Sequence, residues 1–199
     1  MGLKSLILVS LILNKSFAWI APSPSKFQNT RSMNHPTDER KTSSSSALGA
    51  ASTEIIGGGR IGALLAEAGD CRVLGRTDSI DENGSGPILV CTRNDALAGI
   101  VDSCPPNRRS DLVFLQNGYL DNFLKSKNLL DNTQVLLYLS KASMDAPAVD
   151  GVTAVNPEGL TAATGKHAQT FADRLSSLNL KCNVVSPVDY RPAMFEKLM

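Results

Sequence analysis

The sequence predicts an α/β fold in which a doubly wound, mainly parallel sheet carries helices on both faces. From residue 53 onward, short apolar runs alternate with segments of helical spacing, and strands separated by helices form parallel sheets. The first apolar run also ends in glycines, as a strand-to-helix turn requires. The length of 199 residues and the hydrophobic content of 42% suffice for one domain with extensions.

The first expected strand, 53–56, leads into the motif Gly57-Gly58-Gly59-Arg60-Ile61-Gly62. Gly57 permits a tight turn, Gly59 lets the backbone approach a pyrophosphate, and Gly62 lets the following helix pack closely on its strand. The free N–H groups and the positive dipole end of such a helix favour a phosphate. We therefore expect a Rossmann-like domain in which residues 57–62 bind a dinucleotide.

A helix that ends at Gly69 separates this motif from a second expected strand, 71–74. Arg76 follows that strand, nineteen positions after Gly57, where dinucleotide-binding folds place the residue that reads the adenosine ribose. A guanidinium there offers donors to a 2′-phosphate, whereas a carboxylate would repel it. The sequence therefore predicts NADP(H) rather than NAD(H) as the cofactor.

The remaining elements continue the alternation. We expect strands at 87–91, 111–115, 134–139, 151–155 and 182–185, and helices at 96–103, 120–127 and 165–178. Asp95 is expected to cap the first of these helices. Because the carboxyl ends of parallel strands share one edge, the polar residues that follow the first four strands should line one cleft. These residues are 57–62, 76, 92–94 and 116–118.

The glycine motif, the Gly-Arg pair at 75–76, the segment VCTRND at 90–95 and the segment LVFLQNG at 112–118 are the basis of a family resemblance. Together they resemble the N-terminal NADP-binding domain of ketopantoate reductases, within the 6-phosphogluconate dehydrogenase-like oxidoreductases. The resemblance covers about residues 53–199. It implies that Arg93, next to Thr92, contacts a cofactor phosphate and that Asn117 lies near the nicotinamide and the substrate.

A final helix is expected to begin after Pro192 and to carry Lys197. In the family this is where the linker enters an all-helical domain, and Lys197 matches the catalytic lysine there. Such a lysine could donate a proton to the carbonyl being reduced. We expect that helical domain to be absent from this chain, so that the apolar side chains of residues 191–199 (Met194, Phe195, Leu198 and Met199) favour self-association.

Three functions follow from the sequence. The first is the NADP(H)-binding domain of an oxidoreductase resembling ketopantoate reductase, incomplete as given, that transfers hydride to a small keto acid. The second is a non-catalytic NADP(H)-binding sensor or interaction module. The third, a short-chain-type epimerase, is disfavoured because none of Tyr119, Tyr138 and Tyr190 is followed by Lys at the fourth place.

The charge balance and the cysteine spacing argue against a nucleic-acid-binding or a zinc-binding protein. Six of the 20 Lys and Arg residues but two of the 19 Asp and Glu residues lie in residues 1–52, so the expected domain is mildly acidic. That balance argues against a nucleic-acid partner. The four cysteines (Cys71, Cys91, Cys104 and Cys182) have no zinc-ligand spacing. We expect no metal site, and we interpret these cysteines as small buried residues in a reducing compartment.

The N-terminus has the composition of targeting segments. Residues 1–18 place Lys4 before an apolar run and end in Ser16-Phe17-Ala18, which predicts a signal peptide. Residues 19–52 are rich in Ser and Thr, as in transit peptides. Together the two segments resemble the bipartite plastid presequences of algae with complex plastids. We expect a domain over 53–190 in the plastid stroma, with no stable membrane anchor after processing; the alternative is secretion.

Overall fold

The computed structural model describes residues 52–198. The expected signal peptide and nearly all of the expected transit segment lie outside these residues, as does Met199. A search of residues 52–198 found no helix long and apolar enough to cross a membrane.

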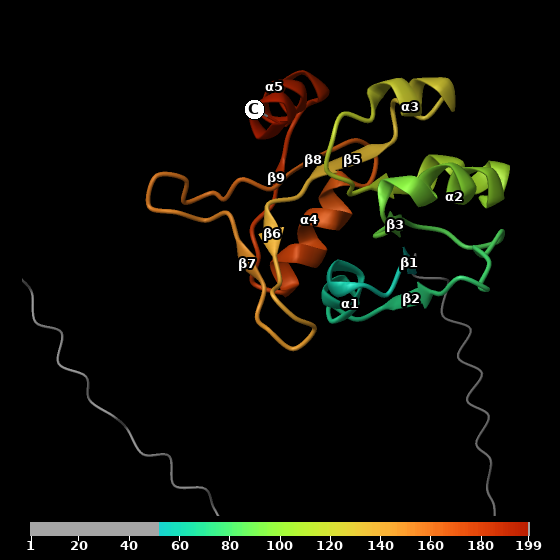
Figure 1. Cartoon of the computed structure of the whole chain (residues 1–199), viewed down its shortest axis with the longest axis horizontal. Coiled ribbons are helices and arrows are strands. Elements are labelled where there is room, and N and C mark those ends of the chain that lie inside the picture. The colour runs from blue at the N-terminus through green and yellow to red at the C-terminus, as the bar shows by residue number, and fades with distance from the viewer. Residues whose placement is uncertain (1–51, 199) are drawn as a thin grey trace, which may run out of the picture. The chain divides into compact units, whose positions relative to one another are not determined.

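Strands and helices alternate along most of this region (Figure 1). The strands are β1 (Thr53–Ile56), β2 (Cys71–Leu74), β3 (Ile88–Val90), β4 (Leu112–Phe114), β5 (Thr133–Leu136), β6 (Leu139–Ser140), β7 (Val149–Asp150), β8 (Ala162–Thr164) and β9 (Asn183–Val184). The helices are α1 (Arg60–Ala66), α2 (Leu97–Ser103), α3 (Asp121–Ser126), α4 (Ala168–Ser177) and α5 (Pro187–Leu198), with 3₁₀ turns at Asn94–Ala96 and Pro106–Asp111.

Seven strands form one sheet in the order β2-β1-β3-β4-β5-β8-β9. Every neighbouring pair is parallel except β5 and β8, which are antiparallel. The chain passes from β1 outward to β2 and then crosses to β3 on the other side of β1. The mainly parallel α/β fold predicted from the sequence is therefore confirmed, and its topological switch point lies at β1, where such sheets bind ligands.

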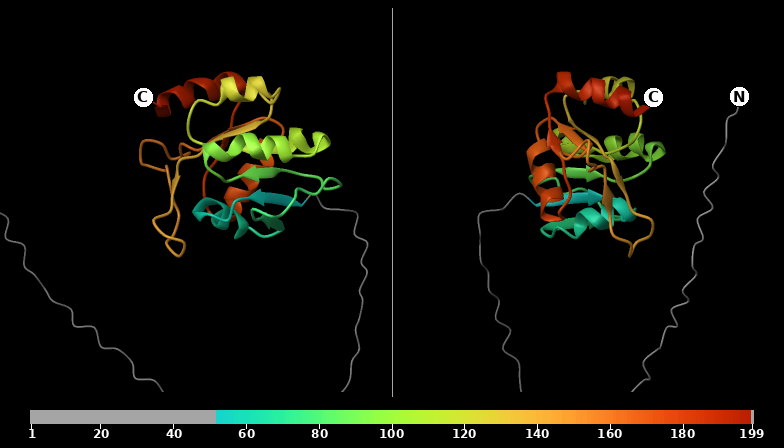
Figure 2. Two further views of the ribbon diagram at one scale, coloured as in Figure 1. Left: turned by 45° about the vertical axis from the view of Figure 1, so that its right-hand side comes forward. Right: turned by 90° about the vertical axis from the view of Figure 1, so that its left-hand side faces the viewer.

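Helices cover both faces of the sheet, as expected (Figure 2). Leu89 in β3 packs on one face with α1 and α4, where Leu65, Phe171 and Leu175 are buried. The neighbouring Ile88 and Val90 point to the opposite face and pack with α2 and α3. Burial on both faces explains why the central strands are continuous apolar runs. It also makes the sheet a rigid support for the loops at its carboxyl edge.

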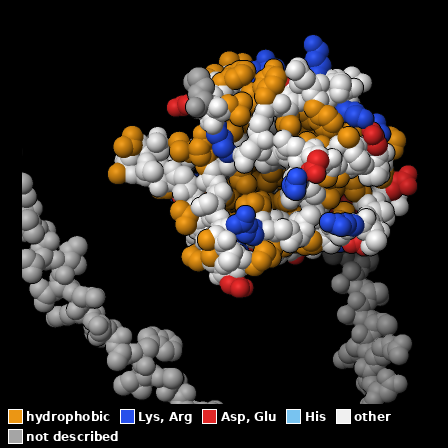
Figure 3. All heavy atoms as spheres, viewed as in Figure 1, with side chains coloured by type: hydrophobic (Ala, Val, Ile, Leu, Met, Phe, Trp, Pro, Cys, Tyr) orange, Lys and Arg blue, Asp and Glu red, His pale blue; other side chains and the backbone are white. Residues whose placement is uncertain are grey.

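Residues 151–155 were expected to form a strand, and this prediction is wrong. These residues are irregular, and the nearby strand β7 instead pairs antiparallel with β6 in a small separate hairpin. The loop between β7 and β8 projects from the body (Figure 1), with hydrophobic side chains at its tip (Figure 3). Val155 there is 86% exposed. The apolar run therefore faces solvent, and the sixth position in the sheet is taken by the short β8, which was not predicted from the sequence.

The final helix begins six residues earlier than predicted, because Pro192 lies inside α5 rather than before it. Ser186 and Asp189 form a capping pair at its start: the Ser186 hydroxyl donates to the Asp189 carboxylate at 2.7 Å and accepts from the Asp189 N–H at 3.3 Å. Pro187 occupies the first helical position, where a proline is favoured. These contacts place the start of α5 ahead of the proline.

The early start lets α5 bury part of its apolar face. Tyr190 and Met194 pack against Leu136 of β5 and Ala162 of β8, so Met194 is buried and does not belong to an exposed apolar face. Phe195 and Leu198 remain half-exposed, and Phe195 stacks on Tyr119 with ring centroids 5.8 Å apart. Self-association through these two side chains stays a prediction.

Candidate functional site

A cavity of about 630 Å³ lies at the carboxyl edge of the sheet, beside the switch point. It takes residues from the segments that follow three adjacent strands: Gly57 and Gly58 after β1, Arg76 after β2, and Thr92 and Arg93 after β3. Its apolar lining includes Ile56, Leu74, Ile80, Ala96 and Ile100. An elongated ligand with an apolar ring and negative charges fits this combination of surfaces.

The glycines of the motif have different structural roles. Gly57 has φ of +102°, and a Cβ there would lie 3.0 Å from the carbonyl oxygen of Cys91. A Cβ on Gly62 would come within 1.8 Å of the Gly57 carbonyl oxygen, so α1 packs directly on the turn. Gly59, in contrast, has no atom within 4 Å of the position of its Cβ. Gly57 and Gly62 thus shape the turn, while Gly59 leaves open space for a ligand to approach the backbone.

Arg76 and Arg93 bring positive charge to the cavity. Both are exposed residues that line it, and the Arg93 Nε lies 3.4 Å from a carboxylate oxygen of Asp95. Asp95 does not cap α2 as expected: it lies in the 3₁₀ turn before that helix, and no side chain bonds to the free N–H groups at the helix start. Exposed guanidinium groups can turn toward phosphate at little cost, because their ion pairs in water are weak.

Thr92 connects this cavity to a second, smaller one of about 130 Å³. The smaller cavity is lined by Ile61, Asn117 and the apolar side chains Leu115, Leu137 and Leu139, among others. The Thr92 hydroxyl oxygen is buried and has no hydrogen-bond partner among residues 52–198. Since buried polar groups are nearly always paired, this hydroxyl is available to a ligand that runs from one cavity into the other.

Asn117 and Lys197, the two residues expected to be catalytic, are in contact although they are far apart in sequence; Asn117 lines the smaller cavity, and Lys197 binds it from outside that lining. The Lys197 ammonium donates to the Asn117 side-chain oxygen at 2.8 Å and also to the Leu137 carbonyl oxygen. It lies 4.4 Å from the centre of the Tyr138 ring, in a cation–π arrangement. Helix α5 thus brings the lysine to the carboxyl edge of the sheet, beside the loop after β4. The catalytic role of the pair stays a prediction.

The environment of Lys197 changes its acidity. Partial burial disfavours the charged form and lowers the pKa of the ammonium below its usual value. A lysine with a lowered pKa releases its proton more readily to a nearby acceptor. Tyr138 was not identified as a contributor to this environment from the sequence, because its proximity depends on the path of the chain after β5.

Two motif residues lie where the sequence did not place them. The Arg60 guanidinium donates to the carbonyl oxygens of Lys141 and Ala142, at 2.8 and 3.1 Å. It therefore ties α1 to the β6–β7 hairpin and does not line the large cavity. Ile61 lines the smaller cavity beside Asn117 rather than the large one. A role for either residue in cofactor binding stays a prediction.

The cysteines of the described region are free thiols, and Cys104 is fully buried. Burial raises the pKa of Cys91 and Cys182 to about 12 and that of Cys104 to about 11. These thiols therefore stay protonated near neutral pH, in keeping with a packing role. Among residues 52–198, no three His, Cys, Asp or Glu side chains are arranged to hold a metal ion.

Comparisons with known proteins bear on the fold. No protein-family model matches the chain, and a search of curated proteins finds no match. A reductive aminase from Aspergillus terreus in complex with NADPH4, cyclohexanone and allyl amine is 17% identical with a TM-score of 0.52, over 74% of this chain and 58% of that one. An imine reductase from Aspergillus terreus is 16% identical with a TM-score of 0.50, over 74% and 59%.

A ketopantoate reductase of the PanE/ApbA family from Ralstonia eutropha is 16% identical with a TM-score of 0.46, over 67% of this chain and 56% of that one. The chain thus spans less than two thirds of the length of these solved structures. At such identities the likeness concerns the fold, and the reductive aminase and imine reductase structures confirm a Rossmann-like arrangement for residues 52–198.

Proposed function

We propose that this chain is the NADP(H)-binding domain of an oxidoreductase that transfers hydride to a small keto acid. The observation that carries the proposal is the shared lining of one cavity by the glycine turn and two arginines: Gly57, Gly58, Arg76 and Arg93 meet there, after three adjacent strands. The solved reductive aminase with a similar fold is itself bound to NADPH4.

The residues present suit each part of a phosphorylated dinucleotide. Gly59 leaves open space where the pyrophosphate would approach the backbone. Arg76 and Arg93 supply donors for a 2′-phosphate, and Ile80 and Ile100 supply an apolar surface for the adenine. The unpaired Thr92 hydroxyl lies between this end of the cleft and the cavity at Asn117.

At the far end of the cleft, Asn117 and Lys197 are suited to bind and protonate a carbonyl oxygen. The cofactor, when bound, supplies the hydride. The Asn117 side-chain oxygen and the Leu137 carbonyl oxygen hold the Lys197 ammonium in one position, and the lowered pKa of that ammonium favours donation of a proton to the developing alkoxide. The neighbouring Leu115, Leu137 and Leu139 give the cavity beside Asn117 an apolar wall, and Asn117 itself is exposed.

A non-catalytic NADP(H) sensor or interaction module is the second candidate. It is favoured by the exposure of Asn117, because water then reaches a site from which hydride transfer would need it excluded. We further propose that the protein acts in a plastid stroma, as the composition of residues 1–52 predicts.

The test is NADPH oxidation in the presence of pyruvate and longer keto acids, with the wild-type protein and a Lys197→Met variant. Methionine keeps the length of the side chain but removes its donors. The matched control is Lys127→Met, which removes another lysine that pairs with a carboxylate, Asp102, away from the cleft. Turnover that is lost in the Lys197 variant alone supports the enzyme; tight NADPH binding without turnover of any keto acid supports the sensor.

A further inference from the structure

The outer wall of the large cavity is a loop without helix or strand, residues 75–87, here named the wall loop. Asp78, Ser79 and Ile80 of this loop line the cavity. Ile80 and Pro87 are its only apolar side chains, and most of its residues are exposed. Apolar burial alone is therefore too small to fix its position, so other contacts must hold it against the cleft.

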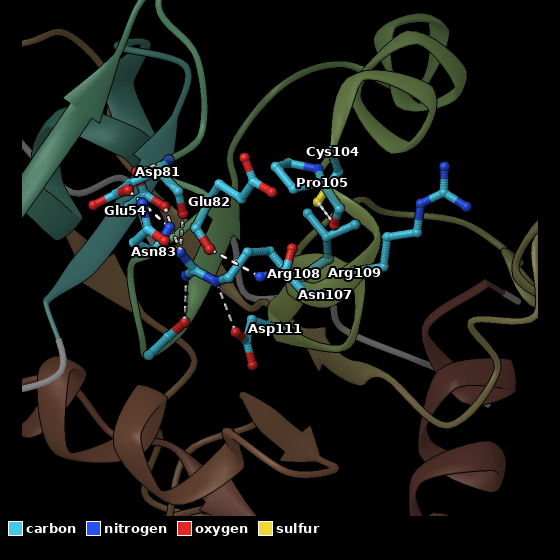
Figure 4. Close-up of polar contacts among 12 residues, drawn as sticks. Glu54, Asp81, Glu82, Asn83, Cys104, Pro105, Asn107, Arg108, Arg109 and Asp111 are labelled. Atoms are coloured by element: carbon cyan, nitrogen blue, oxygen red, sulfur yellow. Dashed lines mark hydrogen bonds and ion pairs between the residues drawn. The ribbon is translucent and has the colours of Figure 1, made fainter.

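Two arginines outside the loop, Arg72 and Arg108, bind its backbone carbonyls, and Figure 4 shows Arg108 beside Asp81 of the loop. Arg72 donates to the carbonyl oxygen of Ser79 at 2.8 Å. Arg108 donates to those of Asp81 and Gly86, at 2.6 and 3.1 Å. The wall loop is thus held in its middle, at Ser79 and Asp81, and near its end, at Gly86, by two guanidinium groups.

One buried carboxylate orients both arginines. Glu54, the second residue of β1, is 2% exposed, and its two oxygens contact Arg72 and Arg108. The same carboxylate accepts a hydrogen bond from the Asp81 N–H at 3.2 Å. Arg108 has a second carboxylate partner, because its Nε donates a hydrogen bond to Asp111 at 2.9 Å. Glu54, Arg72, Arg108 and Asp111 therefore form a single hydrogen-bonded network, and the first three of them bond to the loop.

This network is costly to bury, since such ion pairs often contribute little more than an apolar cluster of the same volume would. The network instead orients the backbone of the wall loop, because planar guanidinium groups fix the geometry of the carbonyls they bind. Space is also tight: a Cβ on Gly84 would lie 2.4 Å from Arg108 Nη1. The arginines therefore hold the loop in one conformation.

We propose that Arg72 is a positioning residue for the adenosine half of the cofactor: with Glu54 and Arg108 it holds residues 79–81 so that Ser79 and Ile80 close the cleft. This inference rests on the proposed NADP(H) function. Arg72 itself does not line the cavity, so it acts through the wall loop. Its side chain is half-exposed, and its replacement is compatible with folding, unlike that of Glu54 or Arg108.

The experiment titrates the full chain with NADPH, with 2′,5′-ADP as the adenosine half and with reduced nicotinamide mononucleotide as the other half. The variants are Arg72→Gln, Arg72→Lys and Asn107→Ala. The last of these removes the hydrogen bond from Asn107 to the Glu82 carbonyl oxygen in the loop, which is 2.9 Å long. The matched control is Arg174→Gln, because Arg174 also binds two backbone carbonyls, of Leu65 and Asp70, but lies outside the cleft.

We expect Arg72→Gln to weaken 2′,5′-ADP and NADPH binding about 3- to 10-fold, the loss of one or two hydrogen bonds. Affinity for the nicotinamide half should not change, Arg72→Lys should restore part of the loss, and Asn107→Ala should act in the same direction as Arg72→Gln. Hydrogen exchange of the Asp81 amide should also accelerate in Arg72→Gln.

Three results would overturn the inference. Wild-type affinity for 2′,5′-ADP in both Arg72→Gln and Asn107→Ala would show that the wall loop needs no such support. An equal loss in Arg174→Gln would show a general effect on stability. A wild-type protein that binds neither NADPH nor 2′,5′-ADP would overturn the proposed function and this inference with it, whereas the first two results leave the proposed function standing.

Discussion

Two substitutions in the glycine turn, Gly62→Ala and Gly59→Ala, separate its role in folding from its role in binding. In Gly62→Ala the new Cβ would lie 1.8 Å from the Gly57 carbonyl oxygen, so the two atoms must move apart by more than about 1 Å to reach any contact seen in proteins. Helix α1 cannot simply move, because Leu64 and Leu65 fix it in the core at 4% and 0% exposure. Such overpacking costs about 1–3 kcal/mol.

The matched substitution is Gly59→Ala, where the added methyl meets no atom within 4 Å. The φ of −71° at this position suits alanine, so the cost to stability should stay below about 1 kcal/mol, that of a poorer helix cap. The methyl would instead occupy the space through which a pyrophosphate approaches. We therefore expect Gly62→Ala to lower stability, and Gly59→Ala to weaken NADPH binding in a protein that remains folded.

Urea unfolding followed by circular dichroism measures the first effect. With a typical slope of about 1–3 kcal/mol per molar urea, the midpoint of Gly62→Ala should fall by roughly 1 M, while that of Gly59→Ala should move much less. An unchanged midpoint in Gly62→Ala would refute the close packing of α1 on the turn. Unchanged NADPH affinity in a folded Gly59→Ala would refute the placement of the pyrophosphate.

Two further predictions concern stability. Burial alone would raise the pKa of Asp111, but hydrogen bonds from Lys166, Arg108 and His167 outweigh burial and hold that pKa below its usual 3.8. The stability that these contacts contribute is therefore present above about pH 4 and is lost as the pH falls through the lowered pKa. Urea midpoints measured across the acid range should depend less on pH in Asp111→Asn, and an unaltered pH dependence would contradict this. Ser186→Ala removes the cap of α5 and should lower the free energy of unfolding by about 1 kcal/mol. An unchanged thermal midpoint in this variant would contradict the prediction.

The central strands and helices were predictable because their signals are local. Apolar runs such as Ile88–Val90 are buried on both faces, and the helix over Ala168–Ser177 carries Phe171 and Leu175 at helical spacing. The errors have local causes too. The run at 151–155 has strand composition but lies in a projecting loop. Pro192 by itself indicates a helix boundary, but the Ser186 cap upstream marks the true start of the helix.

The site was predictable only in part. Residues that follow strands were found because parallel strands end at one edge, which brings Gly57, Arg76 and Arg93 together. The roles proposed for Lys197 and Asn117 come only from a family resemblance, and the contact between the two residues was not predicted. The Glu54 network was missed because a single acid in an apolar strand gives no signal of its partners. The register of β1 and β2 places Arg72 opposite Glu54, and Arg108 reaches Glu54 from the 3₁₀ turn before β4.

Calorimetric titration of the full chain with NADPH and with NADH, alongside an Arg76→Ala variant, tests the central claim most directly. The structure predicts binding of NADPH that is much tighter than that of NADH, because Arg76 and Arg93 both face the cavity, and it predicts that loss of Arg76 removes most of this preference. Absence of binding by either nucleotide, or equal affinity for both in the wild-type protein, would contradict the assignment of this cleft to NADP(H).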